Sequence, residues 1–359
     1  MDSIALQTLL IAIVVGISCA ILGVFLVLRK MSMMIDAISH TVLLGIVLAY
    51  MFTKDLSSPL LTFGATFIGV LTVFFIELLV KTKRTSEDAA TGAVFPFLFS
   101  LAVIIITTQF RSTHLDSHAI NGNLEFAAFE QLTLFGISLG SKTLFTNTLV
   151  LLLLVGVIGL LYKELKLSTF DEALAKTLGF MPGVLHYLLM TLVSLTAVSS
   201  FEAVGSILVI AMMIGPAVTS LLISKELKSV LFTSACIAVF NTSMGYFISM
   251  IVLKGYVNIA ATIATVTFLT FLVVWILEPN KGLITSVLRK HSQKKEFELL
   301  ALMMHVATHQ DTEEQTQELN IDHIILELNW SQNQYDKRVK EGKHLGYLKE
   351  QTRILELTS

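Results

Sequence analysis

Long apolar runs alternate with short polar connections along most of the chain. A helix needs about 20 apolar residues to cross a membrane, and nine runs come close to this length. They lie at 4–28, 36–52, 60–80, 91–109, 143–162, 183–199, 204–223, 229–253 and 257–277. The sixth and seventh are joined only by residues 199–203, and the first lacks the basic flank and cleavage motif of a signal peptide. The pattern predicts an all-α polytopic membrane protein with about nine transmembrane helices.

The composition is typical of an integral membrane protein. Hydrophobic residues make up 54% of the 359 positions and charged residues 14%, whereas an average soluble domain is about 25% charged. This balance excludes an ordinary soluble enzyme. Cys19 and Cys236 lie far apart inside apolar runs, so we expect two buried thiols and no disulfide framework.

Lysine and arginine are distributed unequally between the two sides of the predicted spans. If the N-terminus lies outside, the inner connections and the segment after the last span carry fifteen cations: Arg29, Lys30, Lys81, Lys83, Arg84, Lys163, Lys166, Lys176, Lys225, Lys228, Lys281, Arg289, Lys290, Lys294 and Lys295. The outer connections carry four: Lys54, Arg111, Lys142 and Lys254. Because cytoplasmic loops are enriched in cations, this distribution predicts an N-out, C-in orientation.

The polar tail, 291–359, is predicted to be separate from the membrane domain, 1–290. Helical patterns at 294–309, 321–328 and 331–341 precede two short stretches that could pair as a hairpin. Three helices and a two-stranded wing are typical of a winged-helix-like domain, here on the cytoplasmic side. The tail from Ser292 onward has eight Lys and Arg against twelve Asp and Glu. DNA binding needs a basic footprint, so we expect a protein-contact or regulatory role instead of nucleic-acid binding.

The stretch Arg29–Gly45 carries an acid and an imidazole into an apolar segment. Asp36 and His40 are four residues apart, so on a helix their side chains share one face. Ionisable side chains within a span are costly in lipid and face protein or a water-filled path. One oxygen and one nitrogen donor form half of a site for a divalent transition metal. A polar pair that hydrogen-bonds between helices is the alternative.

Glu202 precedes a seventh span that is rich in small residues, and we predict it as a third metal ligand. Hydropathy places it closer to the outer surface than Asp36, so a hydrated carboxylate or a gate residue at the outer mouth is the alternative. Within the same span, Gly215-Pro216 predicts a kink or a break, which is typical of helices that line cavities.

The longest outer connection, 110–142, contains a further candidate. His114, Asp116 and His118 alternate there, which suggests metal ligands at the place where an ion first meets the protein. An ordinary solvated loop is the alternative, and it is the interpretation we favour.

The inner connection, 163–182, predicts a short helix between spans. Ser168 or Thr169 can provide its N-cap, and Gly179 and Pro182 end it. A short capped helix on the cytoplasmic face is what a transmembrane subunit needs to dock a motor subunit. The alternative is a surface helix with no partner.

Three stretches together resemble the membrane permeases of bacterial ABC importers for manganese, zinc and iron. They are residues 29–45, 200–220 and 170–179, and the resemblance covers about residues 4–290. It implies that Asp36 and His40 lie on the metal path, and that Glu202 stands where the family often has a glutamine or a glutamate. It also implies an ATPase-coupling segment, whose matching positions are Phe170, Asp171, Ala175 and Gly179.

The resemblance further implies a set of partners at the bacterial inner membrane. These are cytoplasmic ABC ATPase subunits, an extracytoplasmic metal-binding protein, and a second copy or a sibling permease in a dimer. The chain has no GxxxxGK[ST] phosphate loop, so it is not expected to hydrolyse ATP itself. No cofactor is expected, because manganese, zinc or iron is the cargo. Two alternatives stay open: a permease for a metal chelate or another small solute, and a membrane-bound regulator acting through the C-terminal domain.

Overall fold

A computed structural model describes residues 3–55, 58–110, 124–129, 131–134, 137–280, 282–309, 319–351 and 354–357. Within this part of the chain, nine helices are long and apolar enough to cross a membrane. They are α1 (Ser3–Leu28), α2 (Met33–Thr53), α3 (Pro59–Lys81), α4 (Glu87–Gln109), α7 (Lys142–Leu160), α10 (Pro182–Val204), α11 (Ser206–Ile223), α12 (Leu227–Phe247) and α13 (Ile259–Leu277). A π-helical turn, Ile248–Val252, extends α12. The predicted apolar spans are therefore confirmed.

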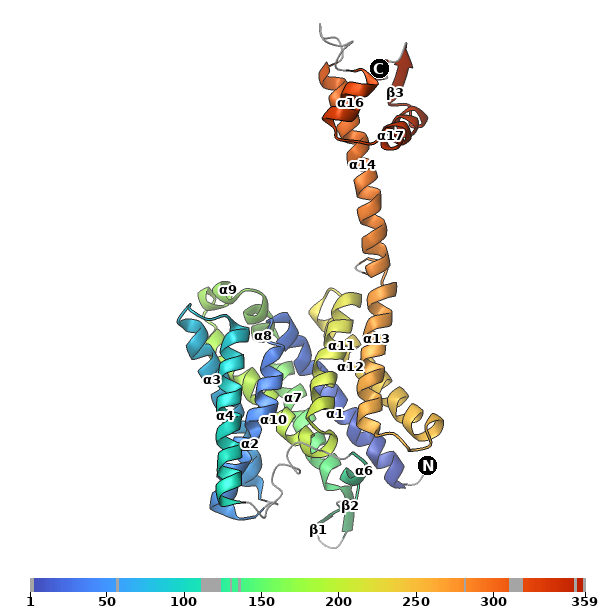
Figure 1. Ribbon diagram of the computed structural model, residues 1–359. Coiled ribbons are helices and arrows are strands. Elements are labelled where there is room, and N and C mark those ends of the chain that lie inside the picture. The colour runs from blue at the N-terminus through green and yellow to red at the C-terminus, as the bar shows by residue number, and fades with distance from the viewer. Residues whose placement is uncertain are drawn as a thin grey trace. The chain divides into compact units, whose positions relative to one another are not determined.

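The membrane unit is built around α1. This helix packs against α7, α10, α11 and α12, and its side chains Leu22 and Phe25 are completely buried. A second group consists of α2, α3 and α4, and α10 packs against α2 and α3 as well as α1 (Figure 1). The elements that carry the predicted metal path and the coupling segment therefore share one continuous core.

Two glycines allow unusually close contacts between these helices. A Cβ atom added to Gly23 on α1 would lie 1.7 Å from the backbone oxygen of Met213 on α11. A Cβ on Gly45 of α2 would lie 2.4 Å from the backbone oxygen of Gly64 on α3. Small residues let membrane helices approach until their backbones touch, and at these two crossings no side chain fits.

The seventh span differs from the sequence prediction in two respects. The α10 helix continues to Val204 and meets α11 at Gly205, whose φ is 80°, so residues 199–203 are helical and form no separate connection. The α11 helix runs through Pro216 without a break. A Cβ on Gly215 would lie 2.3 Å from a side-chain carbon of Thr267 on α13. This glycine therefore serves close helix packing.

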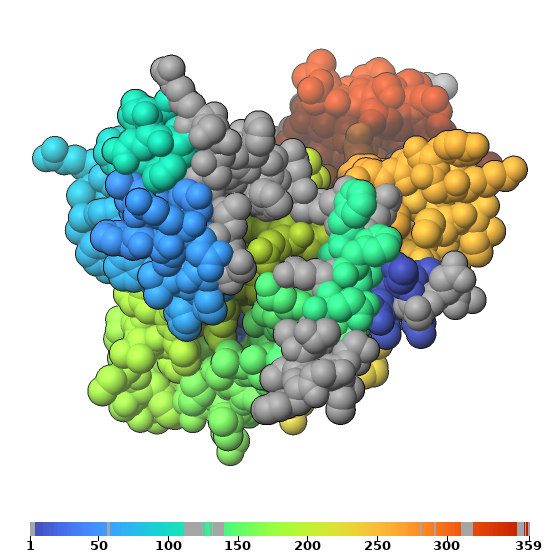
Figure 2. All heavy atoms as spheres, turned by 90° about the horizontal axis from the view of Figure 1, so that it is seen from below, coloured from blue at the N-terminus to red at the C-terminus, as the bar shows by residue number. Residues whose placement is uncertain are grey.

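The two ends of the membrane unit carry different short elements. Helices α8 (Tyr162–Phe170) and α9 (Glu172–Thr177) lie at one end. The short helix α6 (Leu124–Ala127) and the antiparallel strands β1 (Gln131–Leu134) and β2 (Ile137–Ser141) lie at the other end, where α1 begins (Figure 1). The end-on view in Figure 2 shows α6 beside the first residues of α1. The two long connections thus lie at opposite ends of the bundle.

The second unit, Ile276–Ser359, has a core of its own. It contains α14 (Leu283–His309), α16 (Ile321–Glu327), α17 (Gln332–His344) and an antiparallel hairpin of β3 (Leu348–Gln351) and β4 (Ile354–Leu357). Apolar side chains from all five elements pack together, among them Val306, Ile324, Tyr335, Leu348 and Leu355. The α14 helix runs without interruption through position 290, the predicted end of the membrane domain.

Candidate functional site

Asp36 and His40 face the same side of α2, as their spacing predicts. Asp36 lies in the first turn of the helix and His40 in the next, with His40 Nε2 3.5 Å from Asp36 Oδ1. The side chains are 39% exposed for His40 and 44% exposed for Asp36 in the single chain. Neighbouring α2 residues, including Ala37, Ile38 and Ser39, are buried. The pair therefore borders the buried face of α2 and keeps part of its surface open.

The imidazole of His40 is held by aromatic rings from α4. Its centroid lies 5.6 Å from that of Phe95 in a stacked arrangement and 5.8 Å from that of Phe99 in an edge arrangement. Two such contacts restrict the rotation of the ring. The imidazole is thus held in a defined direction beside the carboxylate, as a ligand pair requires.

Glu202 lies in the last turn of α10, exposed between buried Phe201 and Ala203. Among the described residues of the membrane unit, no three His, Cys, Asp or Glu side chains bring ligand atoms close enough to share an ion. A single chain thus brings Asp36 and His40 together without adding Glu202. The predicted outer-loop residues lie outside the described part of the chain: His114, Asp116 and His118.

The predicted coupling segment consists of two short helices joined at Asp171. This residue is the N-cap of α9, and its Oδ1 accepts a 2.9 Å hydrogen bond from the backbone N–H of Leu174. The prediction that Ser168 or Thr169 caps the helix is wrong, because both residues belong to α8. An aspartate binds the free N–H groups of a first turn and also suits the positive end of the helix dipole.

The segment presents an apolar surface. Four large hydrophobic side chains are exposed on it: Phe170, Leu174, Leu178 and Met181. Ala175 is completely buried beneath them, and Gly179, with φ 85°, ends the second helix as predicted. Exposed apolar side chains grouped on a short element mark interaction sites more often than isolated ones do.

Arg29 connects this segment to the spans beneath it. Its Nε donates to Thr169 Oγ1 at 3.2 Å and its Nη2 donates to Ser168 Oγ at 3.0 Å. Its Nη1 lies 3.4 Å from His186 Nδ1 on α10. Burial lowers the pKa of the Arg29 guanidinium, and the charge of Glu172 opposes that change. Arginine stays protonated in proteins, so a fixed positive charge lies between α8 and the bundle.

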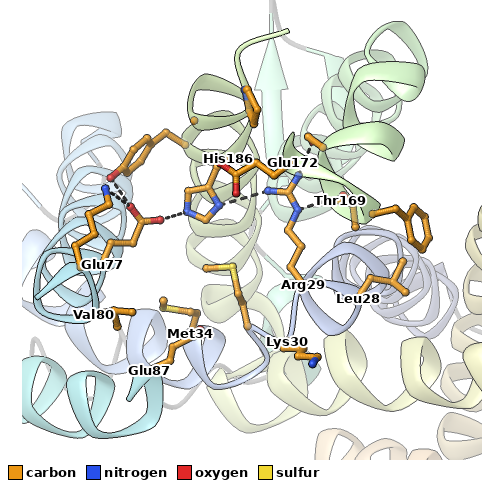
Figure 3. Close-up of a pocket in the computed structure, with 17 residues that line it drawn as sticks. Leu28, Arg29, Lys30, Met34, Glu77, Val80, Glu87, Thr169, Glu172 and His186 are labelled. Carbon is orange, nitrogen blue, oxygen red and sulfur yellow. Dashed lines mark hydrogen bonds and ion pairs between the residues drawn. The ribbon is translucent and has the colours of Figure 1, made fainter. Parts of the chain in front are cut away.

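The chain of polar contacts continues from His186 to Glu77 on α3. Because the guanidinium can only donate, His186 Nδ1 accepts and the ring proton lies on Nε2, which is 2.5 Å from Glu77 Oε1. Glu77 Oε2 accepts a 2.8 Å hydrogen bond from the Tyr187 hydroxyl and lies 3.5 Å from Lys81 Nζ. Figure 3 shows His186 between Arg29 and Glu77 in a cavity of about 680 Å³.

This network ties four segments together at one end of the bundle. The turn after α1 supplies Arg29, and α3, α8 and α10 supply its partners. The His186–Glu77 pair has the donor types of a metal site, but Arg29 and Lys81 already neutralise it and would repel a cation. The sequence reasoning missed the pair. The sequence does contain a signal for this pair, because Glu77 and His186 fall inside predicted apolar runs, where ionisable residues are candidates for a functional role.

Comparisons with known proteins agree with the predicted resemblance. Residues 1–278 match the ABC 3 transport family. The chain is 36% identical over 355 residues to the zinc transport system membrane protein TroD of Treponema pallidum, covering 99% of this chain and 96% of that protein. It is 39% identical over 285 residues to the manganese transport system membrane protein MntD of Bacillus subtilis, covering 79% of this chain and 95% of that protein.

A solved structure shows the same architecture. PsaBC from Streptococcus pneumoniae, determined in complex with Fab, is similar with a TM-score of 0.64 and 30% sequence identity. The similarity covers 78% of this chain and 94% of that chain. Together the family match and these relatives confirm the resemblance on which the sequence prediction was based.

Proposed function

The chain belongs to the ABC 3 transport family, and from that premise we propose that it is the membrane permease subunit of an ATP-driven importer for a divalent transition metal. The nine candidate spans among its described residues and its family make it a multi-pass protein of the cell membrane. The relatives named above are a zinc and a manganese transport system membrane protein. Manganese, zinc and iron are therefore the candidate cargoes.

The observation that carries the proposal is the Asp36–His40 pair. Its oxygen and nitrogen donors lie 3.5 Å apart on one helix, and stacking on Phe95 holds the imidazole in place. Carboxylate and imidazole are ligands that manganese, iron and zinc all accept. One chain therefore supplies two of the ligands that a transported ion needs.

A second permease copy would complete this site. Zinc takes four ligands and manganese more, whereas one chain offers two. The open surface on Asp36 and His40 is where further ligands would reach the ion. A symmetric dimer, or a dimer with a sibling permease, doubles the pair across its axis. Glu202 would act in such an assembly as a further ligand or as a gate at the outer mouth.

The coupling segment is the proposed docking surface for the cytoplasmic ATPases. Its exposed residues Phe170, Leu174, Leu178 and Met181 would enter a pocket on the motor subunit. The contacts of Arg29 with Ser168 and Thr169 would pass movement of that segment to α1, α3 and α10. The partner subunit then hydrolyses ATP, and the permease provides the path for the metal ion.

The proposed orientation of the membrane unit follows from the proposal that α8 and α9 dock the cytoplasmic ATPases. With α8 and α9 in the cytoplasm, the N-terminus and the segment of α6, β1 and β2 face outward, where an extracytoplasmic metal-binding protein would deliver the ion. The unit Ile276–Ser359 then lies in the cytoplasm. Its three helices and its hairpin resemble a winged helix, and with its excess of acidic residues we assign it a regulatory or protein-contact role.

Radiometal uptake tests the proposed function. The chain would be reconstituted into vesicles with its ATPase and its binding protein, and accumulation of manganese, zinc and iron would be compared with and without ATP. We expect ATP-dependent accumulation of at least one of these free ions. Uptake of a chelate or another solute, with none of the free ions accumulating, would instead support a permease for a different cargo.

A further inference from the structure

A second cluster of histidine and acidic side chains lies in the unit Ile276–Ser359. His305 comes from α14, and His323 and Glu327 come from α16 one turn apart. Their ligand atoms all lie within 4.8 Å of one another. We propose that these three residues form a cytoplasmic binding site for a divalent transition metal of the zinc class, distinct from the membrane pair.

The distances fit one shared ion. His305 Nδ1 lies 3.3 Å and His323 Nδ1 lies 3.6 Å from the same oxygen, Glu327 Oε2. Zinc binds imidazole nitrogen and carboxylate oxygen at about 2.0–2.2 Å in a tetrahedron, whose edges are then about 3.4 Å long. Two of the three separations match such edges, and all three lie within 4.8 Å, so side-chain shifts of about 1 Å would let one ion contact the three atoms.

The ligand types favour zinc over manganese or magnesium. Two imidazoles and one carboxylate form a nitrogen-rich set, and imidazole suits zinc, copper, nickel and iron. A third imidazole, His309, lies one turn further along α14, with its ring centroid 4.8 Å from that of His305. His309 is not among the residues whose ligand atoms lie within 4.8 Å of one another, so water would fill the fourth position of the tetrahedron. His305 is 8% exposed, so the site has one buried ligand and an accessible side.

The site would add a polar link between two elements that also meet in the apolar core of this unit. The α16 helix has only seven residues, and Ile324 is its one fully buried side chain. A helix of this length is not stable by itself in water. An ion held by His305 on one side and by His323 and Glu327 on the other would clamp α16 to the end of α14. The cytoplasmic location of this clamp rests on the proposed function, whereas the site itself does not.

Metal binding by the purified full-length chain tests the site. The chain in detergent would be stripped with a chelator and titrated with Zn²⁺ by calorimetry, with Co²⁺ absorption as an optical probe of imidazole ligands. We expect His323→Ala and Glu327→Gln to weaken one site by at least about tenfold. Both side chains are half-exposed, so these variants should fold; His305→Ala removes a buried ring and serves as a third variant.

Two controls separate this site from other metal binding. His344→Ala changes an exposed histidine of α17 in the same unit and should keep the site. Asp36→Asn combined with His40→Ala changes the membrane pair and should also keep it. If Zn²⁺ affinity and stoichiometry are the same in His323→Ala, Glu327→Gln and His344→Ala, the cluster is only a set of ion pairs and the proposal is wrong.

Hydrogen exchange tests the clamp. Zn²⁺ should slow amide exchange in α16 of the wild-type chain and leave exchange unchanged in Glu327→Gln. An ion that binds without protecting α16 would overturn the clamp. Neither experiment depends on transport, so a failure here is distinguishable from a failure of the proposed importer.

Discussion

Two acid–imidazole pairs in the described part of the chain have the same four-residue spacing, Asp36–His40 and His323–Glu327, and their surroundings differ. Asp36 and His40 lie 3.5 Å apart on α2, and the imidazole stacks on aromatic rings of α4. His323 and Glu327 lie 3.6 Å apart on α16, and His305 reaches the same carboxylate oxygen from α14. Spacing on a helix brings two donors to one face, but the neighbouring helix decides how many ligands an ion meets. The Asp36–His40 pair is suited to an ion that passes through, and the His323–Glu327 pair with His305 is suited to an ion that stays bound.

A third pair shows what happens when the neighbour is a cation. His186 and Glu77 come from different helices and approach within 2.5 Å, yet the guanidinium of Arg29 contacts the imidazole and Lys81 lies beside the carboxylate. These two positive charges would repel a further cation beside the pair. This pair therefore connects α3 and α10 to the segment that Arg29 contacts, although its chemistry resembles that of the other two.

The largest expected effect is the loss of transport when the membrane pair is removed. Asp36→Ala and His40→Ala should each reduce ATP-dependent metal accumulation to background at normal expression, because each deletes half of the ligands that one chain provides. The measurement is radiometal uptake in reconstituted vesicles, with immunoblotting for protein amount. Glu327→Gln, a change in the pair of α16, is the matched control and should retain uptake. Unchanged uptake in both α2 variants would remove the pair from the metal path.

The second-largest expected effect concerns the His186–Glu77 pair, whose imidazole contacts the guanidinium of Arg29. Arg29→Ala should lower the free energy of unfolding by about 2 kcal/mol, because hydrogen bonds to a charged group are lost and His186 is left without its donor. Thermal unfolding in detergent measures this, and uptake should fall with it. Arg29→Lys should not restore either property, since an ammonium cannot reach three partners in a planar arrangement.

Lys166→Ala serves as the control for that experiment. Lys166 is an exposed cation of α8 at the same end of the bundle, and its removal should leave unfolding and uptake as in the wild type. Equal stability of the Arg29 and Lys166 variants would show that the network contributes nothing to the fold.

The smallest expected effect comes from the aromatic support of His40. Phe95→Ala should raise the metal concentration for half-maximal uptake by about fivefold, the equivalent of about 1 kcal/mol of stacking. Phe97 is exposed on the same helix, so Phe97→Ala is the matched control and should leave that concentration unchanged. A loss of maximal rate with no change in half-saturation would indicate that Phe95 acts on the fold instead of on the orientation of the imidazole.

Much of the membrane unit could be predicted because its signals are local. Apolar runs locate the spans, and the helical period places Asp36 and His40 on one face. The end of α9 at Gly179 also follows from a local rule, since glycine adopts positive φ without strain. These features depend on residues within one or two turns of each other.

The parts that were missed depend on packing between distant segments. Arg29 contacts Thr169 and His186, which lie more than a hundred positions away in the sequence. The sequence could not show that Ser168 and Thr169 face a guanidinium instead of capping a helix. Gly215-Pro216 predicted a kink or a break, but α11 runs through both residues without a break, and Gly215 lets α11 pack closely on α13.

The crossing at Gly23 limits how the transport cycle proceeds. With the glycine of α1 directly against the carbonyl of Met213, there is no layer of side chains along which α1 and α11 could slide. Interiors this densely packed transmit displacement instead of absorbing it, so these two helices move as one rigid body. Gating has to be accommodated at other positions, and the junction at Gly205, whose φ of 80° is open chiefly to glycine, is the point where this pair of helices meets α10.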